Sequence, residues 1–333
     1  MSAGEPIPRD SLHYQWVSSV VRSVEKLSGR PSRWNGELYE ETRPKSAGSA
    51  LDGGGVTINV DKVLNPVAKA YTADRPLTED ELVEARDAVL TVVHEAKHLT
   101  NVLGDEDAPG ATPVYSADTL ALEEGLTENW AHASVDAVIQ DIGMDQAQPD
   151  ILSAESIDSY PAYTAATDEL IRGTAEVTGL SPSQVLDRLD PADRTQRWAT
   201  IADMVIDQRL ADVLPAEDRE AVRTQLMQTM RPHLGDVVAT QKSELLSDVA
   251  KSIGGHQSAQ RAVTALSTTA AGLEDQYRDA ASGQPSQGAD VEHLRKFLGG
   301  GSGQSYRGGH EAGAVPDNVR QLSQRREQGQ GRE

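Results

Sequence analysis

Residues His94-Glu95-Ala96-Lys97-His98 form an H-E-x-x-H motif inside a strongly helical segment and are the most informative part of the chain. Two histidines four residues apart fall on one face of an α-helix, about 40° apart around its axis, so both imidazoles can reach one metal ion. Glu95 follows the first histidine directly and flanks that ion without ligating it. A carboxylate in this place suits the general base of metal-assisted hydrolysis. The motif therefore predicts a metal site on this helix.

The helix that carries the motif is expected from Thr78 to Leu103. Thr78 and Glu81 form a capping-box pattern at its start, and Gly104 is a stop signal after its last apolar residue. A stripe of apolar residues at alternating spacings of three and four predicts the face that packs on the core. Its members are Leu82, Ala85, Val89, Val92, Ala96, Leu99 and Leu103.

The two histidines lie outside this apolar stripe. On the helical wheel His94 and His98 fall roughly opposite Val92, among polar residues. They are therefore expected to face solvent or a cleft, and a solvated histidine pair is the alternative to a metal site. Lys97 is expected to point to solvent.

A third ligand is needed, because a catalytic zinc takes three protein ligands and keeps one position open for water. Downstream lies Leu122-Glu-Glu-Gly-Leu-Thr-Glu-Asn-Trp130, on a second helix predicted from Ser116 to about Ile142. Glu124 and Glu128 share one face of it, so one acid can bind the metal while the other accepts a hydrogen bond from a ligating histidine.

Other residues of the second helix are open to simpler interpretations. An exposed acidic helix is the alternative for Glu123, Glu124 and Glu128, since the chain is so acidic overall. Gly125 is expected to let the two helices approach closely. His132 is expected to be a packing or surface residue, and Trp130 a core residue.

These spacings resemble the gluzincin group of zinc metallopeptidases, over roughly residues 78–142. The resemblance implies zinc as the cofactor and a peptide or protein as the substrate. It also implies His94, His98 and Glu124 as ligands, Glu95 as general base and proton shuttle, and Glu128 as the residue that supports the first histidine.

The chain departs from that group in two ways. Position 123 is Glu, where related enzymes often have Asn, and this adds charge near the metal. The tyrosine or histidine that stabilises the transition state in the group has no matching motif here. The candidates left open are Tyr115, Tyr160, Tyr163, His233 and Tyr277.

Outside the two central helices, the patterns predict a small sheet and further helices. A helix is expected over 11–27, strands over 35–42 and 53–60, and a helix over 61–71. If the strand over 53–60 lies at the edge of its sheet, it can pair with an extended peptide. After a polar connection over 146–161, helical patterns are broken at Gly179, Pro191, Pro215 and Gly254-Gly255.

The expected fold is therefore α+β and mostly α, a zincin-like metalloprotease fold with a small mixed sheet before the H-E-x-x-H helix. Residues 1–145 are expected to form the lobe that carries both site helices, and 146–280 a helical lobe that completes the cleft. Residues 281–333, rich in Gly, Gln and Arg, are expected to be disordered apart from a turn over 291–298.

Composition limits the partners and the location. The formal charge of −21 disfavours nucleic acid and anionic membranes. The absence of cysteine excludes disulfides, thiolate zinc sites and cysteine nucleophiles. No stretch reaches the roughly 20 apolar residues of a membrane span, and the N-terminus lacks the apolar run of a signal peptide. The expected location is cytoplasmic, or outside the cell by a route that needs no such signal; the oligomeric state is left open.

Three functional hypotheses follow. The first is a zinc-dependent peptidase, with cleavage within chains favoured over cleavage at their ends. The second is a zinc-stabilised helical binding module without catalysis, and the third is a proteolytic effector or toxin delivered to another target.

Overall fold

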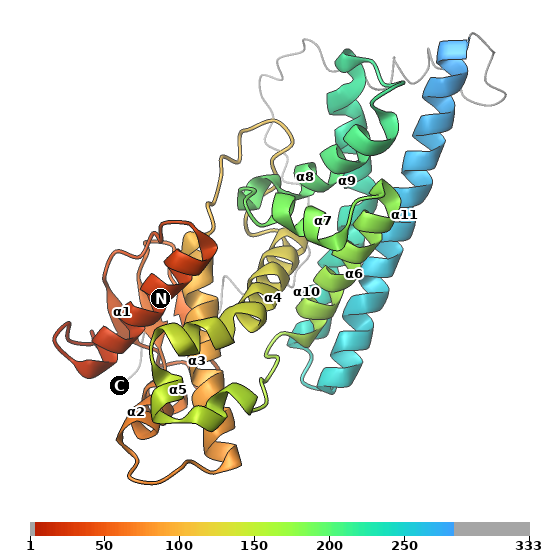
Figure 1. Cartoon of the computed structure of the whole chain (residues 1–333). Helices are drawn as coiled ribbons and strands as arrows, with labels where there is room; N and C mark the ends of the chain where they lie inside the picture. Colours follow the sequence, from red (N-terminus) through yellow and green to blue (C-terminus); the bar gives the residue numbers. More distant parts are fainter. Residues whose placement is uncertain (1–3, 283–333) are drawn as a thin grey trace, which may run out of the picture. The chain divides into compact units, whose positions relative to one another are not determined.

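The computed structural model describes residues 4–282, and every structural statement below concerns these residues (Figure 1). Residues 1–3 and 283–333 lie outside them, and so do the turn over 291–298 and nearly all of the tail expected to be disordered. The first two residues of that tail, 281 and 282, belong to a helix.

A three-stranded mixed sheet precedes the motif helix. Its strands are β1 (Leu38–Glu40), β2 (Gly48–Ala50) and β3 (Val56–Ile58). The order is β1-β3-β2, with β1 parallel and β2 antiparallel to the central β3. The condition for peptide pairing along 53–60 is not met, because β3 is paired on both sides and is not an edge strand. The edge strands are β1, whose outer side bonds to residues 5–7, and β2, whose Gly-Ser-Ala sequence carries no β-branched residue. The edge strand that borders the motif helix, and is meant below, is β2.

The motif helix α3 (Glu79–Thr100) begins as predicted. Thr78 accepts a hydrogen bond from the Glu81 amide, and the Glu81 side chain accepts one from the Thr78 amide, which completes the capping box. The helix ends three residues before Leu103. Gly104 follows in a left-handed conformation, with φ of 88°, that other residues rarely adopt.

Helices make up most of the described chain, so the prediction of a mostly helical α+β fold with a small mixed sheet is confirmed. The α-helices besides α3 are α1 (Leu12–Ser28), α2 (Asn65–Thr72), α4 (Ala117–Asp141), α5 (Met144–Ala147), α6 (Pro161–Thr178), α7 (Pro182–Leu189), α8 (Arg197–Val205), α9 (Arg219–Gly235), α10 (Val237–Lys242) and α11 (Asp248–Ser282). Short π turns lie at Val60–Leu64 and Ile206–Leu210, and 3₁₀ turns at Pro149–Ser153, Arg194–Gln196 and Ala216–Asp218.

The helix break expected at Gly254-Gly255 is wrong, because both glycines lie inside α11. A Cβ on Gly255 would stand 2.0 Å from the carbonyl oxygen of Ala162 on α6. This glycine therefore serves helix packing, since it lets α6 and α11 lie against each other at their backbones.

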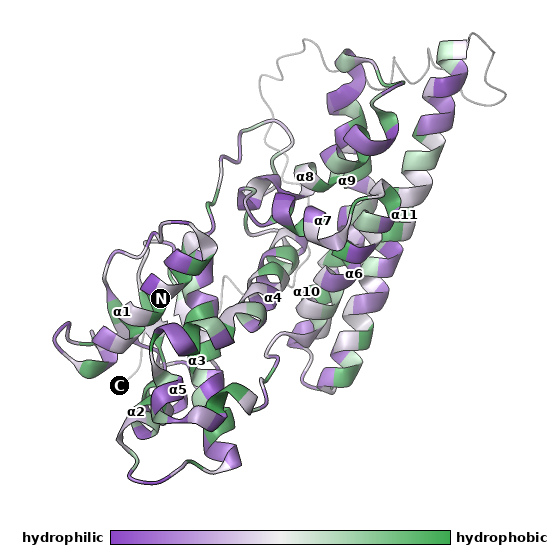
Figure 2. Ribbon diagram, in the orientation of Figure 1, coloured by the Kyte–Doolittle hydropathy of each residue, from purple (hydrophilic) through white to green (hydrophobic). Residues whose placement is uncertain are grey.

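Two hydrophobic cores share α4. The first packs α1, α2, α3 and the sheet against Val135 and Ile139 of α4. The second packs α6 to α11 against Leu122 and Leu126, farther toward the start of the same helix. Both hydrophilic and hydrophobic residues occur along α4 and α11 (Figure 2). None of the helices within residues 4–282 combines the length and the apolar character that crossing a membrane requires.

Candidate metal centre

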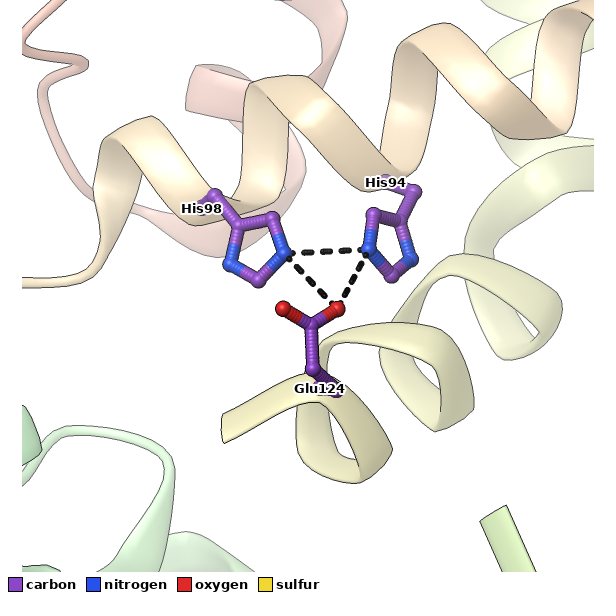
Figure 3. A group of neighbouring side chains, drawn as sticks. All are labelled: His94, His98 and Glu124. Carbon is purple, nitrogen blue, oxygen red and sulfur yellow. Dashed lines mark hydrogen bonds and ion pairs between the residues drawn. The ribbon is translucent and has the colours of Figure 1, made fainter. Parts of the chain in front are cut away.

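The histidines of the motif face α4. His94 and His98 project from α3 toward Glu124 (Figure 3), and only 3% and 8% of their surfaces are exposed. They are thus more buried than a polar helix face suggests, although both border a cleft. The alternative of a solvated histidine pair is wrong.

Three side-chain atoms converge between the two helices. His94 Nε2 lies 3.0 Å from His98 Nε2 and 3.3 Å from Glu124 Oε2, and the third side of the triangle, between His98 Nε2 and Glu124 Oε2, is 3.4 Å. Zinc binds nitrogen and oxygen ligands at about 2.0–2.1 Å, which places two corners of a tetrahedron about 3.3 Å apart. The three atoms are therefore spaced as three corners of a tetrahedral metal site, and this group could hold a metal ion.

Each ring is fixed on its other side by a carboxylate. His94 Nδ1–H donates to Glu128 Oε2 at 2.7 Å, and His98 Nδ1–H donates to Glu123 Oε1 at 2.8 Å. In its neutral form, with the proton on Nδ1, each imidazole presents the lone pair of Nε2 toward Glu124.

Glu123 has a contact that the sequence did not predict. It is fully buried and pairs with the Arg197 guanidinium from α8, and it also accepts a hydrogen bond from Asn101 at 3.1 Å. Arg194 Nε lies 3.4 Å away. The negative charge of Glu123, expected near the metal, is thus balanced by Arg197 and Arg194.

The pKa directions show that the group favours positive charge. Burial alone would lower the pKa of His98, but Glu124 and Glu123 outweigh it and raise the pKa to about 9. The pKa of His94 is raised in the same way by hydrogen bonds to Glu124 and Glu128. Burial would raise the pKa of Glu124, yet the two rings hold it well below its ordinary value. A divalent cation would supply the positive charge that these carboxylates favour.

Glu95 lies between the metal group and the edge strand. Its Oε2 accepts a hydrogen bond of 2.6 Å from the backbone amide of Ala50 on β2. A Cβ on Gly48 would stand 3.2 Å from Cγ of Glu95 and 3.1 Å from the carbonyl oxygen of Thr57. The edge strand therefore holds the carboxylate in place, and the small residue at its start leaves room for it.

A cleft opens beside these residues. One pocket of about 540 Å³ is lined by His94, Glu95, His98 and Glu124 together with β2 and the residues after it. A second pocket of about 230 Å³ shares His94 and Glu95 and extends toward the residues before β2. Glu95 thus borders two pockets along β2 that share lining residues.

The structure separates the tyrosine and histidine candidates by position. Tyr160 lines both pockets, and its ring stacks on His94 with centroids 5.0 Å apart and planes inclined by 18°. Tyr115 lines the larger pocket but is 70% exposed. Tyr163 is buried and stacks on Tyr160. His233 and Tyr277 line neither pocket; Tyr277 donates to Asp218 in the helical core.

A second group of possible metal ligands lies one turn along α4. Glu128, His132 and Asp158 bring ligand atoms within 4.8 Å of one another. Both oxygens of Glu128 and Oδ1 of Asp158 already have hydrogen-bond partners. Glu128 accepts from His94 and His132, while Asp158 Oδ1 accepts from the Tyr160 amide at 2.8 Å and from the Thr164 hydroxyl at 3.1 Å.

Two expectations about neighbouring residues are wrong. Lys97 is buried, with its Nζ 2.6 Å from Asp190 Oδ1 and 5.1 Å from the centroid of the Trp130 ring. Gly125 does not serve the contact with α3. A Cβ there would stand 2.1 Å from Thr167 Oγ1 and 2.5 Å from the carbonyl oxygen of Tyr163, so this glycine lets α4 approach α6.

Comparison of the chain with models of known families, with curated proteins and with solved structures finds no match, so the interpretation of the site depends on its own geometry.

Proposed function

We propose that this chain is a zinc-dependent peptidase with a zincin-like arrangement of its motif helix, sheet and third-ligand helix. In this proposal His94, His98 and Glu124 hold the ion, Glu95 is the general base, and Glu128 and Glu123 orient the two rings. The observation that carries the proposal is the triangle of 3.0, 3.3 and 3.4 Å between the three ligand atoms. A gluzincin-like role of the same residues agrees with it.

The donor set favours zinc over harder cations. Two imidazole nitrogens and one carboxylate are common ligands of catalytic zinc, whereas calcium and magnesium prefer oxygen ligands throughout. Two ring nitrogens already turned toward the acid lower the cost of organising the site when the ion binds.

The chemistry of the reaction follows from the residues around this position. When bound, zinc supplies a Lewis acid that polarises a substrate carbonyl and makes a water easier to deprotonate. Glu95 takes the proton as the water oxygen bonds to the carbonyl carbon. It then delivers the proton to the amide nitrogen as the carbon–nitrogen bond breaks. The hydrogen bond from Ala50 holds this carboxylate beside the cleft.

Tyr160 is the residue that best fits stabilisation of the developing oxyanion. Its ring lies on His94 and it lines both pockets. Burial, together with the charges of Glu124 and Glu95, raises the pKa of Tyr160 well above its usual value. The phenol therefore keeps its proton at neutral pH and can donate a hydrogen bond.

Catalysis fits the site better than a purely structural role of the ion. A structural zinc is closed by four protein ligands, whereas here three potential ligands border a cleft of about 540 Å³. A binding module without catalysis would also not explain why the carboxylate of Glu95 is held beside the metal group.

Metal analysis and turnover test the proposal together. Purified wild type should hold one zinc ion per chain and cleave an unfolded, fluorescently labelled protein substrate. Glu95→Gln should keep the zinc and lose at least about a thousandfold in turnover, because it removes the base but no ligand. Tyr160→Phe should also keep the zinc, with a loss of about tenfold to a hundredfold in kcat.

Two further variants separate ligand from supporting residue. Glu124→Ala should lose zinc, whereas Glu128→Ala should keep it with affinity lowered by about tenfold to a hundredfold. Full turnover by Glu95→Gln, or unchanged zinc content in Glu124→Ala, would contradict the proposal.

A further inference from the structure

Basic side chains gather around the larger pocket of an otherwise acidic protein. The chain has 31 lysines and arginines against 52 aspartates and glutamates. The larger pocket reverses this balance. Four basic residues line it, and its acidic residues are Glu95, Glu124 and Asp52. The four basic residues are Arg33, Arg43, Lys45 and Arg194.

Two of these cations are tied to the end of the motif helix. The backbone amide of Arg33 donates to the carbonyl of Leu99 at 2.9 Å, and that of Arg194 donates to Val102 at 2.9 Å. The Arg33 side chain is exposed and, among residues 4–282, has no ion-pair partner. It therefore offers a free guanidinium to whatever enters the pocket.

The other two cations lie beside the edge strand. Arg43 is held by Glu41 and by the Ser49 hydroxyl of β2, with half of its side chain exposed. The hydrogen bond from Arg43 lowers the pKa of Glu41 to about 2, so this anchor stays charged at any ordinary pH. Lys45 pairs with Glu244, and both side chains are largely exposed, which makes this contact easy for a ligand to displace.

The basic character is concentrated on one side of Glu95, because three of the four cations line the larger pocket alone and Lys45 lines both pockets. The larger pocket follows β2 from Gly48 to Asp52 and carries all four cations. The smaller pocket contains Asp87 and Glu128, with Lys45 as its basic residue. A polypeptide lying along β2 would thus meet positive charge on one side of the reacting bond and negative charge on the other.

We infer that the site selects polypeptide segments that carry Asp or Glu on one side of the cleaved bond, the side that lies along Ala50 to Asp52. This inference names the substrate class and rests on the proposed peptidase function. Carboxylates of the segment pair with Arg33 and Arg43, and Lys45 releases Glu244 to join them. Guanidinium groups suit carboxylates because they offer two parallel donors.

Matched peptides on the zinc-loaded full chain test the inference. Internally quenched peptides of one length would carry Glu, Gln or Lys on one side of a central apolar pair, and a second set would carry them on the other side. We expect kcat/KM for Glu over Gln to be at least about tenfold higher in one set alone, with Lys poorest there. The preference should shrink in 0.5 M salt, where charges are screened.

A charge-reversed variant links the preference to the pocket. Arg33→Glu should lower kcat/KM for the Glu peptides about tenfold more than it lowers kcat/KM for the Gln peptides. Arg22→Glu, an exposed arginine on α1 that lines neither pocket, makes the same change in net charge and should leave the preference intact. Zinc content and melting temperature of both variants should match wild type.

A binding measurement separates failure of this inference from failure of the proposed function. Zinc-loaded Glu95→Gln is titrated with the fluorescein-labelled Glu and Gln peptides and followed by anisotropy. Tighter binding of the Glu peptide, lost when Arg33→Glu is added, supports the inference even if wild type cleaves nothing. Cleavage with equal kcat/KM for Glu, Gln and Lys peptides overturns the inference and leaves the peptidase standing. Neither cleavage nor charge-dependent binding overturns both.

Discussion

The group of His94, His98 and Glu124 and the group of Glu128, His132 and Asp158 meet α4 about one helical turn apart. They differ in what holds their side chains. In the first, His94 and His98 each donate from Nδ1 to an outer carboxylate, so both Nε2 atoms turn toward Glu124. In the second, both oxygens of Glu128 and Oδ1 of Asp158 already accept hydrogen bonds within the protein. Proximity of three ligand atoms is common to both groups, but only the first has its lone pairs directed at a common point.

The difference shows that a metal site is defined by the residues behind its ligands. Glu128 belongs to the second group, yet its Oε2 orients His94 of the first group. His132 has one hydrogen bond, to Glu128 Oε1 at 3.2 Å, and no carboxylate holds its other nitrogen within the described residues. The following predictions test this contrast.

The largest expected effect is on metal affinity. His94→Ala should weaken zinc binding on the order of a thousandfold or more, because it removes one of three ligands. His132→Ala should change the affinity less than about threefold. Zinc titration against a competing fluorescent chelator measures both, and a large loss in His132→Ala would move the ion to the second group.

The next largest effect concerns Glu123, the carboxylate that holds the ring of His98. Glu123→Gln leaves the buried Arg197 without its charge partner, which should lower the free energy of unfolding by about 3–5 kcal/mol. It should also weaken zinc binding about tenfold to a hundredfold.

Asp158→Asn is the matched control, because the amide oxygen still accepts from the Tyr160 amide. It should cost less than about 1 kcal/mol. Urea unfolding of both variants without metal checks the comparison, and equal losses would contradict the distinction between the two groups.

A smaller effect concerns the helix that carries both groups. Gly125→Ala places a methyl group against Thr167 and the Tyr163 carbonyl, so α4 and α6 must separate, at a cost of about 1–3 kcal/mol. The zinc affinity should also fall, because the shift of α4 moves Glu124, the residue directly before Gly125. Gly272→Ala on the exposed side of α11 meets nothing within 4 Å and should instead raise the melting temperature slightly. Thermal unfolding of the two variants distinguishes packing from helix propensity.

The smallest expected effect depends on pH. The hydrogen bond to Glu128 raises the pKa of His132 above 6.5, although burial opposes it. The stabilisation from this pair is therefore fully present below pH 6.5 and is lost as the pH rises through the raised pKa. His132→Gln should be less stable than wild type by about 0.5–1 kcal/mol at pH 6, and by less at pH 9. Chemical unfolding at both pH values measures this, and a gap that widens with pH would contradict it.

Local patterns in the sequence predicted the parts of the fold that depend on local interactions. The capping box of Thr78 and Glu81 marked the start of α3, and the spacing of His94 and His98 placed both rings on one face. The grouping of the rings with Glu124 agrees with the four-residue spacing of acids on α4.

Local patterns could not predict contacts between segments that lie far apart in the sequence. The edge strand β2 was missed because its three small residues gain their conformation from pairing with β3. Lys97 was assigned to solvent because a helical wheel does not show that Asp190, 93 residues later, would cover that face. The role of Glu123 depends in the same way on Arg197 from α8.

The sharing of α4 by two hydrophobic cores has a consequence for biosynthesis. Val135 and Ile139 pack mainly against α1, α2, α3 and the sheet, which are synthesised before α4. Leu122 and Leu126 pack against α6 to α11, which are synthesised after it. The histidines of α3 are therefore translated long before the packing that fixes Glu124 and Glu123 is complete. If the proposed function holds, capture of the ion is expected to come late, after the chain has emerged far enough for the second core to close.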